Sequence, residues 1–479
     1  MFNNNLLMGA ASAGGESLVS VGNSALFDSN NSEFLARTPS STGVEEKGTF
    51  SAWIYRGKQG FYYVFTARVS DSQLFQIYFA TAGQLLCGHF SSGIDWQLTT
   101  TRVFRDVGWY HVVLGIDTTQ AIASNRAKLY INGVQITDFG VETYPSLNFV
   151  NDFNTSGVAN HIGSYNPTPA NEFDGYMAEE VWIDGTQYDA SNFGNFDSTG
   201  TFWTPKSSAE IKELTFGTNG FYLDNTTNAQ TDASGNGNNL TNNNTVTLST
   251  HTPTNLNALW NPLSTVGLTT RFPQLSAGNT TAGFSGSTSA RAMLTLPVFY
   301  NTHLEFTVTQ GSGSDTNYPF LQVFPYSTDD YNGDQLVNQS AAGGSGGTGL
   351  ASGASIPNWT TGDRVTLEID TTNGRIYVFI DGSAVNSANP GAGSGFTFDF
   401  TMPASGQLAI VWISQTSAGK TVVVSNPAEF TDSVSAGYFG LTSTIVAAQT
   451  TRTKSNLEEY FDTTLYEGNG AGQRVGKFL

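Results

Sequence analysis

The chain has 479 residues, of which 39% are hydrophobic and 12% are charged, and its formal net charge is −19. This length is too great for a single hydrophobic core and predicts two or three domains, for which the apolar content is ample. The acidic balance argues against nucleic acid and anionic membrane surfaces as partners, because both need patches of Lys and Arg, and the single cysteine excludes an internal disulfide.

The first 16 residues form a short stretch of small side chains, "MFNNNLLMGAASAGGE". This stretch lacks the positive charge and the long apolar segment of a secretory signal. No other apolar run approaches the length of a membrane span, so membrane insertion is not expected. We therefore expect residues 1–16 to be an arm that docks onto another protein.

The rest of the chain divides into zones of different texture. Residues 17–200 are a succession of strand-like segments such as "TFSAWIY" and "WYHVVLGID", and this pattern returns over residues 264–450. Between them, residues 201–263 are rich in Asn, Thr and Gly and are predicted to be a connector. Residues 451–479 form a tail of uncertain shape. The composition predicts an all-β protein with two β-sandwiches in tandem.

One short pattern occurs in both strand-rich zones. "VVLGIDTT" at 112–119 matches "VTLEIDTT" at 365–372 in six of eight positions. In each copy a strand of alternating apolar residues ends in Asp-Thr-Thr, whose carboxylate and hydroxyls can cap a turn. The chain then returns as a strand that ends in Asn-Gly at 132–133 or Asp-Gly at 381–382, typical of a tight hairpin. The repetition favours a shared fold in the two zones.

Larger sequence features resemble known families. In the first zone, "SALFDSNNSEFLART", "GWYHVVLGID" and "FDGYMAEEVWIDG" resemble, in order, a laminin-G-like jelly roll of the concanavalin A-like type. In the second zone, "LEFTVTQ", "TTGDRVTLEIDTTNGRIYVFIDGSAV" and "SAGYFGLTS" resemble a SPRY-type domain, which is also a concanavalin A-like sandwich. The resemblance implies two concanavalin A-like jelly-roll β-sandwiches joined by an Asn/Gly-rich connector.

The joining segment, which begins "FWTPKSSAEIKELTFGTNGFYLDN", resembles the connector of a group of marine bacteriophage virion proteins, as do "MFNNNLLM" and "YEGNGAGQRVGKF". This resemblance implies a structural protein on the exterior of the virion, most simply a tail fibre or receptor-binding protein. The alternative is a head fibre or a capsid decoration protein. Its expected partners are other virion proteins through the N-terminal arm, host surface polysaccharide, and further copies of the chain, since phage fibres are usually trimers.

The second repeat contains part of a catalytic pattern. Laminarinase-type glucanases place a Glu-x-Asp-x-Glu strand on one face of the jelly roll, so that three carboxylates lie side by side. Here Glu368 and Asp370 fit the pattern, but the third position is Thr372. Without a third carboxyl group no acid protonates the leaving oxygen, so catalysis is not expected. A polysaccharide depolymerase is kept as the alternative.

The connector contains a possible calcium loop. Asp232, Ser234 and Asn236 alternate before a glycine, as at the start of an oxygen-rich calcium loop. The twelfth position, where a bidentate Glu is expected, is Asn243. We therefore predict a hydrogen-bonded Asx turn and no metal site, with calcium as the alternative. The sequence contains no motif for an organic cofactor.

Exposed aromatic side chains next to polar groups are candidates for sugar recognition, because sugar rings stack on aromatic faces. In "EEVWIDG", alternation predicts that Val181 and Ile183 face the core and that Trp182 lies on the opposite face. The same reasoning for "RIYVFIDG" leaves two aromatic residues outside the core. The alternative is that loops or a neighbouring subunit cover both faces. The glycan-binding candidates are Glu180, Trp182, Asp184, Tyr377 and Phe379.

Overall fold

The computed structural model describes residues 19–442, with gaps at 105–107, 166–170, 198–199, 201, 262–273, 285–289, 297, 311–319, 326–336, 340–346, 349–350, 353, 355–360, 404–405 and 415–419. The predicted arm and tail lie outside the described residues. The chain divides into two compact units between Asn255 and Leu256. In the described part of the chain, no helix is long and apolar enough to cross a membrane.

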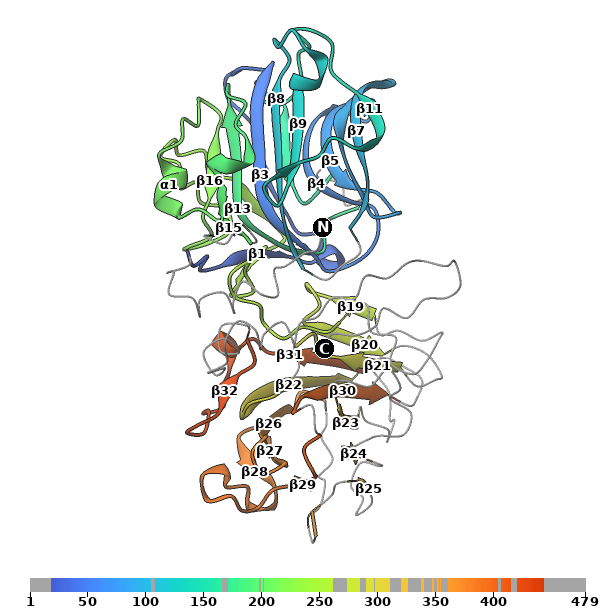
Figure 1. The fold of residues 1–479 in the computed structure, drawn as a ribbon, viewed down its shortest axis with the longest axis vertical. Helices are drawn as coiled ribbons and strands as arrows, with labels where there is room; N and C mark the ends of the chain where they lie inside the picture. The colour runs from blue at the N-terminus through green and yellow to red at the C-terminus, as the bar shows by residue number, and fades with distance from the viewer. Residues whose placement is uncertain are drawn as a thin grey trace. The chain divides into compact units, whose positions relative to one another are not determined.

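The first unit is a sandwich of two antiparallel sheets, which form the two layers at the top of Figure 1. In order across the first sheet, the strands are β10 (Val134–Gln135), β9 (Ala127–Ile131), β8 (Trp109–Asp117), β3 (Lys47–Arg56), β13 (Gly175–Asp184), β1 (Ser24–Phe27) and β18 (Thr247–Ser249), with β16 (Phe221–Leu223) paired to β13. Those of the second sheet are β11 (Phe139–Thr143), β7 (Ile94–Val103), β6 (Gln84–Ser91), β5 (Gln73–Phe79), β4 (Tyr62–Ser70), β12 (Ala159–Ile162), β2 (Phe34–Arg37) and β17 (Thr241–Asn243).

The core of this unit lies between the two sheets. Phe50 on β3 and Leu114 on β8 are direct cross-strand partners in the first sheet, and Phe65 on β4 and Ile77 on β5 are partners in the second. All four are fully buried members of one hydrophobic cluster. Alternate residues of each strand therefore supply the core, as the period of two in the sequence predicts.

Much of the segment predicted to be a connector belongs to the first unit. It supplies β15 (Trp203–Pro205), which pairs with β14 (Gly194–Phe196), then α1 (Ser208–Lys212) and strands β16 to β18. Phe221 and Leu223 of β16 join the hydrophobic core of the sandwich. Burial of such side chains, rather than the Asn-rich composition, determines where this segment packs.

The second unit also contains two sheets. The larger has the order β19 (Gln274–Ser276), β20 (Thr281–Phe284), β31 (Lys420–Val424), β22 (Thr302–Gln310), β26 (Arg364–Asp370), β27 (Arg375–Ile380) and β28 (Ser383–Ala384), with β29 (Phe398–Asp399) on β27 and β32 (Phe439–Gly440) on β22. The smaller has the order β21 (Ala290–Met293), β30 (Leu408–Ser414), β23 (Phe320–Pro325), β24 (Val337–Gln339) and β25 (Gly347–Thr348). Short 3₁₀ helices lie at Ser29–Asn31, Ala123–Asn125, Ala190–Asn192, Val385–Ser387, Pro390–Ala392 and Pro427–Glu429.

The repeated sequence has the same local structure in both units. Asp117 Oδ1 accepts the N–H of Thr119 at the end of β8, and Asp370 Oδ1 accepts the N–H of Thr372 at the end of β26. Each following hairpin turns at an Asx-Gly pair with positive φ, 48° and 78° at residues 132–133 and 48° and 75° at residues 381–382. The predicted turn caps and tight hairpins are confirmed.

Candidate functional site

Trp182 lies in the core of the first unit. Its ring stacks on Phe65 at a centroid distance of 5.1 Å, and its Nε1 donates to Asn154 Oδ1 at 2.7 Å. The prediction that Trp182 faces away from the core is therefore wrong. The cause is a β-bulge in β13, at which Glu179, with a φ of 55°, and Glu180 together oppose one residue of β3. The extra residue reverses the alternation from that point on.

The two acidic neighbours of Trp182 are also buried. Asp184 accepts hydrogen bonds from the main-chain N–H of Val44 (2.8 Å) and of Asn219 (2.9 Å). Glu180 accepts a hydrogen bond from Asn225 Nδ2 at 2.8 Å. Both carboxylates thus hold segments of the first unit together, and neither lies at an accessible surface.

The candidates of the second unit lie on the outer face of its larger sheet. Tyr377 is fully buried, whereas Phe379 is half-buried. Their face is covered by residues 427–438, which we call the strap. Tyr377 is the cross-strand partner of Glu368, which accepts a hydrogen bond from the strap at Ser435 N (2.8 Å). The covering loop kept as an alternative from the sequence is thus present at Tyr377.

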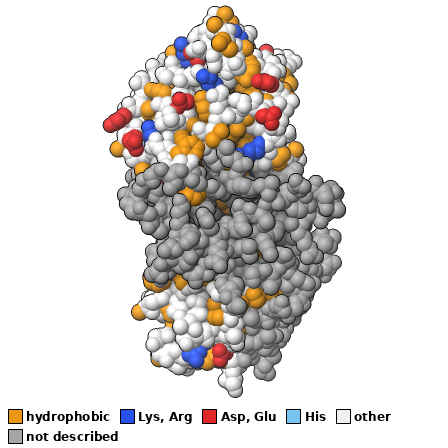
Figure 2. All heavy atoms as spheres, viewed as in Figure 1, with side chains coloured by type: hydrophobic (Ala, Val, Ile, Leu, Met, Phe, Trp, Pro, Cys, Tyr) orange, Lys and Arg blue, Asp and Glu red, His pale blue; other side chains and the backbone are white. Residues whose placement is uncertain are grey.

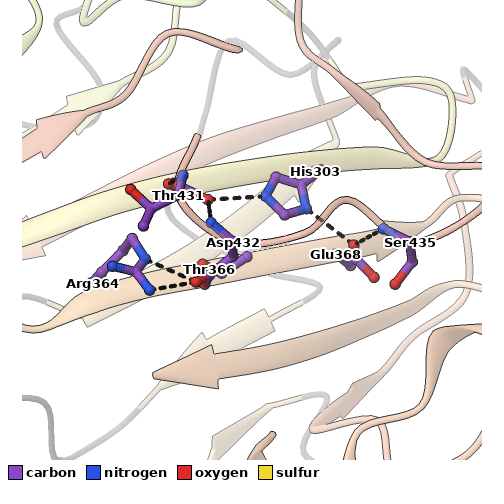
Figure 3. Close-up of polar contacts among 8 residues, drawn as sticks. His303, Arg364, Thr366, Glu368, Thr431, Asp432 and Ser435 are labelled. Atoms are coloured by element: carbon purple, nitrogen blue, oxygen red, sulfur yellow. Dashed lines mark hydrogen bonds and ion pairs between the residues drawn. The ribbon is translucent and has the colours of Figure 1, made fainter. Parts of the chain in front are cut away.

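A buried ionisable network lies beneath the strap (Figure 3). His303 on β22 is placed between Glu305 of the same strand and Glu368 of β26. Its Nδ1 is 3.0 Å from Glu368 Oε1, its Nε2 is 3.4 Å from Glu305 Oε1, and all three side chains are about 1% exposed. Glu368, the first carboxylate of the glucanase-like pattern, is therefore paired with a histidine.

Main-chain N–H groups of the strap complete this network. Thr431 N and Asp432 N donate to Glu305 at 2.9 and 2.6 Å, respectively. Asp432 also pairs with Arg364 of β26 and with Thr366, as Figure 3 shows. The carboxylates on this face thus hold the strap on the sheet.

The loop with calcium-like spacing forms hydrogen bonds within itself and to the neighbouring segment at residues 217–222. Asp232 accepts the main-chain N–H of Tyr222, of Ser234 and of Asn238, at 3.0, 2.8 and 2.7 Å. Asn236 donates its side-chain amide to main-chain oxygens of the neighbouring turn. This is the hydrogen bonding of the predicted Asx turn. The described residues include no group of three or more His, Cys, Asp or Glu that could hold a metal ion.

The outer face of the second sheet of the first unit carries an aromatic cluster that the sequence did not single out. Tyr63 on β4 and Tyr78 on β5 are direct cross-strand partners, and a bulge separates Tyr63 from the core residue Phe65. The bulge puts Tyr63 on the face opposite to Phe65, although residues two apart normally share a face. We call the cluster the aromatic platform; its members are Phe61, Tyr63, Tyr78 and Tyr165.

The rings of the platform are in contact and partly exposed. Phe61 lies 4.7 Å from Tyr78 and 5.1 Å from Tyr63, and Tyr63 lies 5.0 Å from Tyr165, all between ring centroids. Tyr63 forms the buried base, with 7% of its side chain exposed, and the other three rings are half-buried. Burial raises the pKa of Tyr63 and of Tyr78, so both hydroxyls stay neutral near neutral pH.

Polar groups border the platform. The guanidinium of Arg68 lies over the ring of Tyr165 at 5.2 Å and forms an ion pair with the exposed Asp71. The same pairing lowers the pKa of Asp71. Gln76 is the residue of β5 on the same face as Tyr78 and is half-buried. Partly exposed rings beside amide, hydroxyl and charged groups can stack on a sugar and bind its hydroxyls.

On the face of the first unit drawn in Figure 2, small groups of hydrophobic side chains lie among uncharged polar surface and scattered acidic and basic side chains. The sequence signal for the platform was the aromatic run "GFYYVF" before the alternating "QIYF". Period-two reasoning could not assign its faces, because the bulge in β4 is not visible in the sequence.

The chain was compared with known proteins. Residues 28–186 match the family model described as the Concanavalin A-like lectin/glucanases superfamily, which covers a minority of the chain. No curated protein sequence matches the chain significantly.

Three solved structures are among those similar in fold. The native heptameric SAP-like pentraxin from Limulus polyphemus is 14% identical, with 36% of this chain and 80% of that chain covered and a TM-score of 0.28. A putative carbohydrate binding protein from Bacteroides ovatus is 16% identical, with 47% and 59% covered and a TM-score of 0.31. Domains LG4-5 of the mouse laminin alpha1 chain are 11% identical, with 89% of each chain covered and a TM-score of 0.27.

The described part of the chain is thus nearly all β, as predicted, with two sheets in each unit. The family match over residues 28–186 places the laminin G/concanavalin A-like jelly-roll fold in the first unit, also as predicted. The narrower SPRY type of the second unit stays a prediction.

Proposed function

We propose that this protein is a glycan-binding protein without catalytic activity, carried on the exterior of a bacteriophage particle. The aromatic platform supports glycan binding most directly. Sugar rings would stack on Tyr78 and Tyr165, while Gln76 and Arg68 would bind hydroxyl groups. Contacts of this kind are weak singly, and repetition around a homo-oligomer, such as the trimer usual for phage fibres, would supply avidity.

The virion part of the proposal rests on the resemblance of the connector and both chain ends to marine phage virion proteins. A tail fibre or receptor-binding protein would present the platform to host surface polysaccharide. Immunogold labelling of intact particles would test this placement. Label at the tail would support it, whereas label spread evenly over the heads would favour a head fibre or decoration protein.

The lack of catalysis is proposed from the surroundings of Glu368. Its Oε1 is occupied by His303 and by the main chain of the strap, and the third position of the glucanase-like pattern is Thr372. A depolymerase would need an exposed acid beside this carboxylate. Reducing sugars released from host polysaccharide by the wild type, and lost in Glu368→Gln, would revive that alternative.

Substitution of one platform residue tests the binding proposal. Tyr78→Ala removes the ring that faces both Phe61 and Tyr63, and we expect it to weaken binding to polysaccharide by about tenfold or more, as loss of a central aromatic contact commonly does. Binding would be measured on an immobilised panel of bacterial polysaccharides, followed by titration of the strongest binder. Phe196→Ala is the control, because Phe196 is 44% exposed and lies on β14, away from the platform. Equal binding by both variants would rule out the platform as the site.

A further inference from the structure

Glu180 and Asn225 form a completely buried pair with two unexplained oxygens. Glu180 Oε2 accepts a hydrogen bond from Asn225 Nδ2 at 2.8 Å, and both residues are 0% exposed. The other oxygens of the pair, Glu180 Oε1 and Asn225 Oδ1, are buried and have no hydrogen-bond partner among the described residues, although the main-chain N–H of Glu180 also acts on its own carboxyl group. Two buried acceptors without a donor would be a heavy cost to the fold.

We infer that Glu180 is a neutral carboxylic acid that donates its proton from Oε1 to Asn225 Oδ1, so that the pair is a pH-sensitive latch. A carboxylic acid and a primary amide are complementary, since each has one donor and one acceptor on the same side. The proton satisfies both oxygens at once. If the amide of Asn225 is turned over, its oxygen lies 2.8 Å from Glu180 Oε2, and that contact also needs a proton.

The bulge in β13 explains why the latch lies where it does. It places Glu180 on the inward side of the strand, opposite Leu223 of β16, and Leu223 belongs to the hydrophobic core. Burial raises the pKa of Glu180 to about 8, with smaller contributions from the negative charges of Glu179 and Asp224 and against the lowering effect of the hydrogen bonds from its own N–H and from Asn225. Lys212 pairs with Asp224 at 3.0 Å and so partly compensates the charge of Asp224.

The neighbouring carboxyl group has a different partner. Glu179 accepts a hydrogen bond from the hydroxyl of Tyr222, and burial raises the pKa of Glu179 to about 7. Glu179 therefore titrates near the latch but takes no part in the acid–amide pair. Its charge is only a secondary cause of the raised pKa of Glu180, so Glu179→Gln is a suitable control.

The latch fastens a return segment of the first unit. The main-chain oxygen of Asn225 accepts a hydrogen bond from Asn23 Nδ2 at 3.1 Å, next to β1. The segment that follows Asn225 supplies β17 and β18. The pKa of Glu180 is higher in the folded state than in the unfolded chain. The stabilisation by the Glu180–Asn225 pair is therefore complete below the ordinary pKa of 4.5 and is lost as the pH rises through about 8. Alkaline pH should therefore loosen this segment.

Calorimetry of the full-length protein tests the latch. In the wild type, we expect the Tm of the first unit to fall by roughly 5–10 °C between about pH 6 and about pH 9. Glu180→Gln replaces the acid proton by an amide N–H and cannot ionise. At about pH 6, the Tm of Glu180→Gln should lie within a few degrees of the wild-type Tm. Between about pH 6 and about pH 9, the decrease in Tm should largely disappear in Glu180→Gln and should largely remain in Glu179→Gln.

Two results would overturn the latch. The first is a pH dependence in Glu180→Gln that is the same as in the wild type. The second is a Tm raised by calcium and lowered by chelator in the wild type but not in Glu180→Gln, because a cation would then occupy the place of the proton. If Glu180→Gln does not fold, infrared spectra of the wild type can test whether a protonated carboxyl group is present. A carboxylic-acid band at about pH 7.5 that disappears by about pH 9.5 supports the latch, and no such band refutes it.

Discussion

Replacement of Trp182 by alanine should destabilise the first unit by about 4 kcal/mol, a typical value for the loss of a fully buried aromatic side chain. Trp182 stacks on Phe65, meets Phe153 edge to face at 4.9 Å, and donates its indole N–H to Asn154. The substitution removes these contacts and leaves a cavity between the sheets. Denaturant unfolding of the full chain, followed by the signal of the first unit, would measure the loss.

The matched control is Ile122→Ala. Ile122 is 62% exposed in a loop of the same unit, so its truncation should change the free energy of unfolding by less than about 0.5 kcal/mol. A small effect of Trp182→Ala, comparable to the control, would show that Trp182 does not lie in the core. That result would support the prediction from strand alternation, which places Trp182 on the face opposite to the core.

Replacement of Glu305 by alanine should destabilise the second unit by about 3–5 kcal/mol. The carboxylate accepts two main-chain N–H groups of the strap, from Thr431 and Asp432, and lies 3.4 Å from His303 Nε2. Removal takes the acceptor from both N–H groups and leaves the buried His303 without this carboxylate, which costs more than the net value of the lost hydrogen bonds. We expect the strap to detach before the sandwich unfolds.

Hydrogen exchange at the amides of Thr431 and Asp432 would report detachment of the strap. Both amides should exchange much faster in Glu305→Ala than in the wild type. Glu305→Gln retains a side-chain oxygen that can accept one of the two N–H groups and should lose only part of the protection. Unaltered protection in Glu305→Ala would mean that the strap is held by other contacts.

Trp182 and Glu305 each bind a loop through a polar group. In each unit, polar groups on buried strands bind loops that come from distant parts of the sequence, as Asp184 does with Val44 and Glu305 with Asp432. Such carboxylates resemble site residues in the sequence, because an acid beside an aromatic residue also describes a sugar site. They differ from site residues in that main-chain donors occupy them.

The sequence alone determined the fold class and much of the local structure. Strand alternation, the Asp-Thr-Thr caps and the Asx-Gly hairpins at 132–133 and 381–382 depend on residues close together in the chain, so the local pattern suffices to predict them. The sequence also shows directly that Thr372 occupies the position of the third carboxylate in the glucanase-like pattern.

Only the tertiary structure decided which faces are buried and which are available. One extra residue in β13 turned Trp182 into the core, and one in β4 turned Tyr63 out onto the platform. The strap covers Glu368 through Ser435, which lies 67 residues further along the chain. Alternation predicts a face only until a bulge reverses it, and neither bulges nor long-range covering segments have a local signature, because cross-strand register and burial establish both.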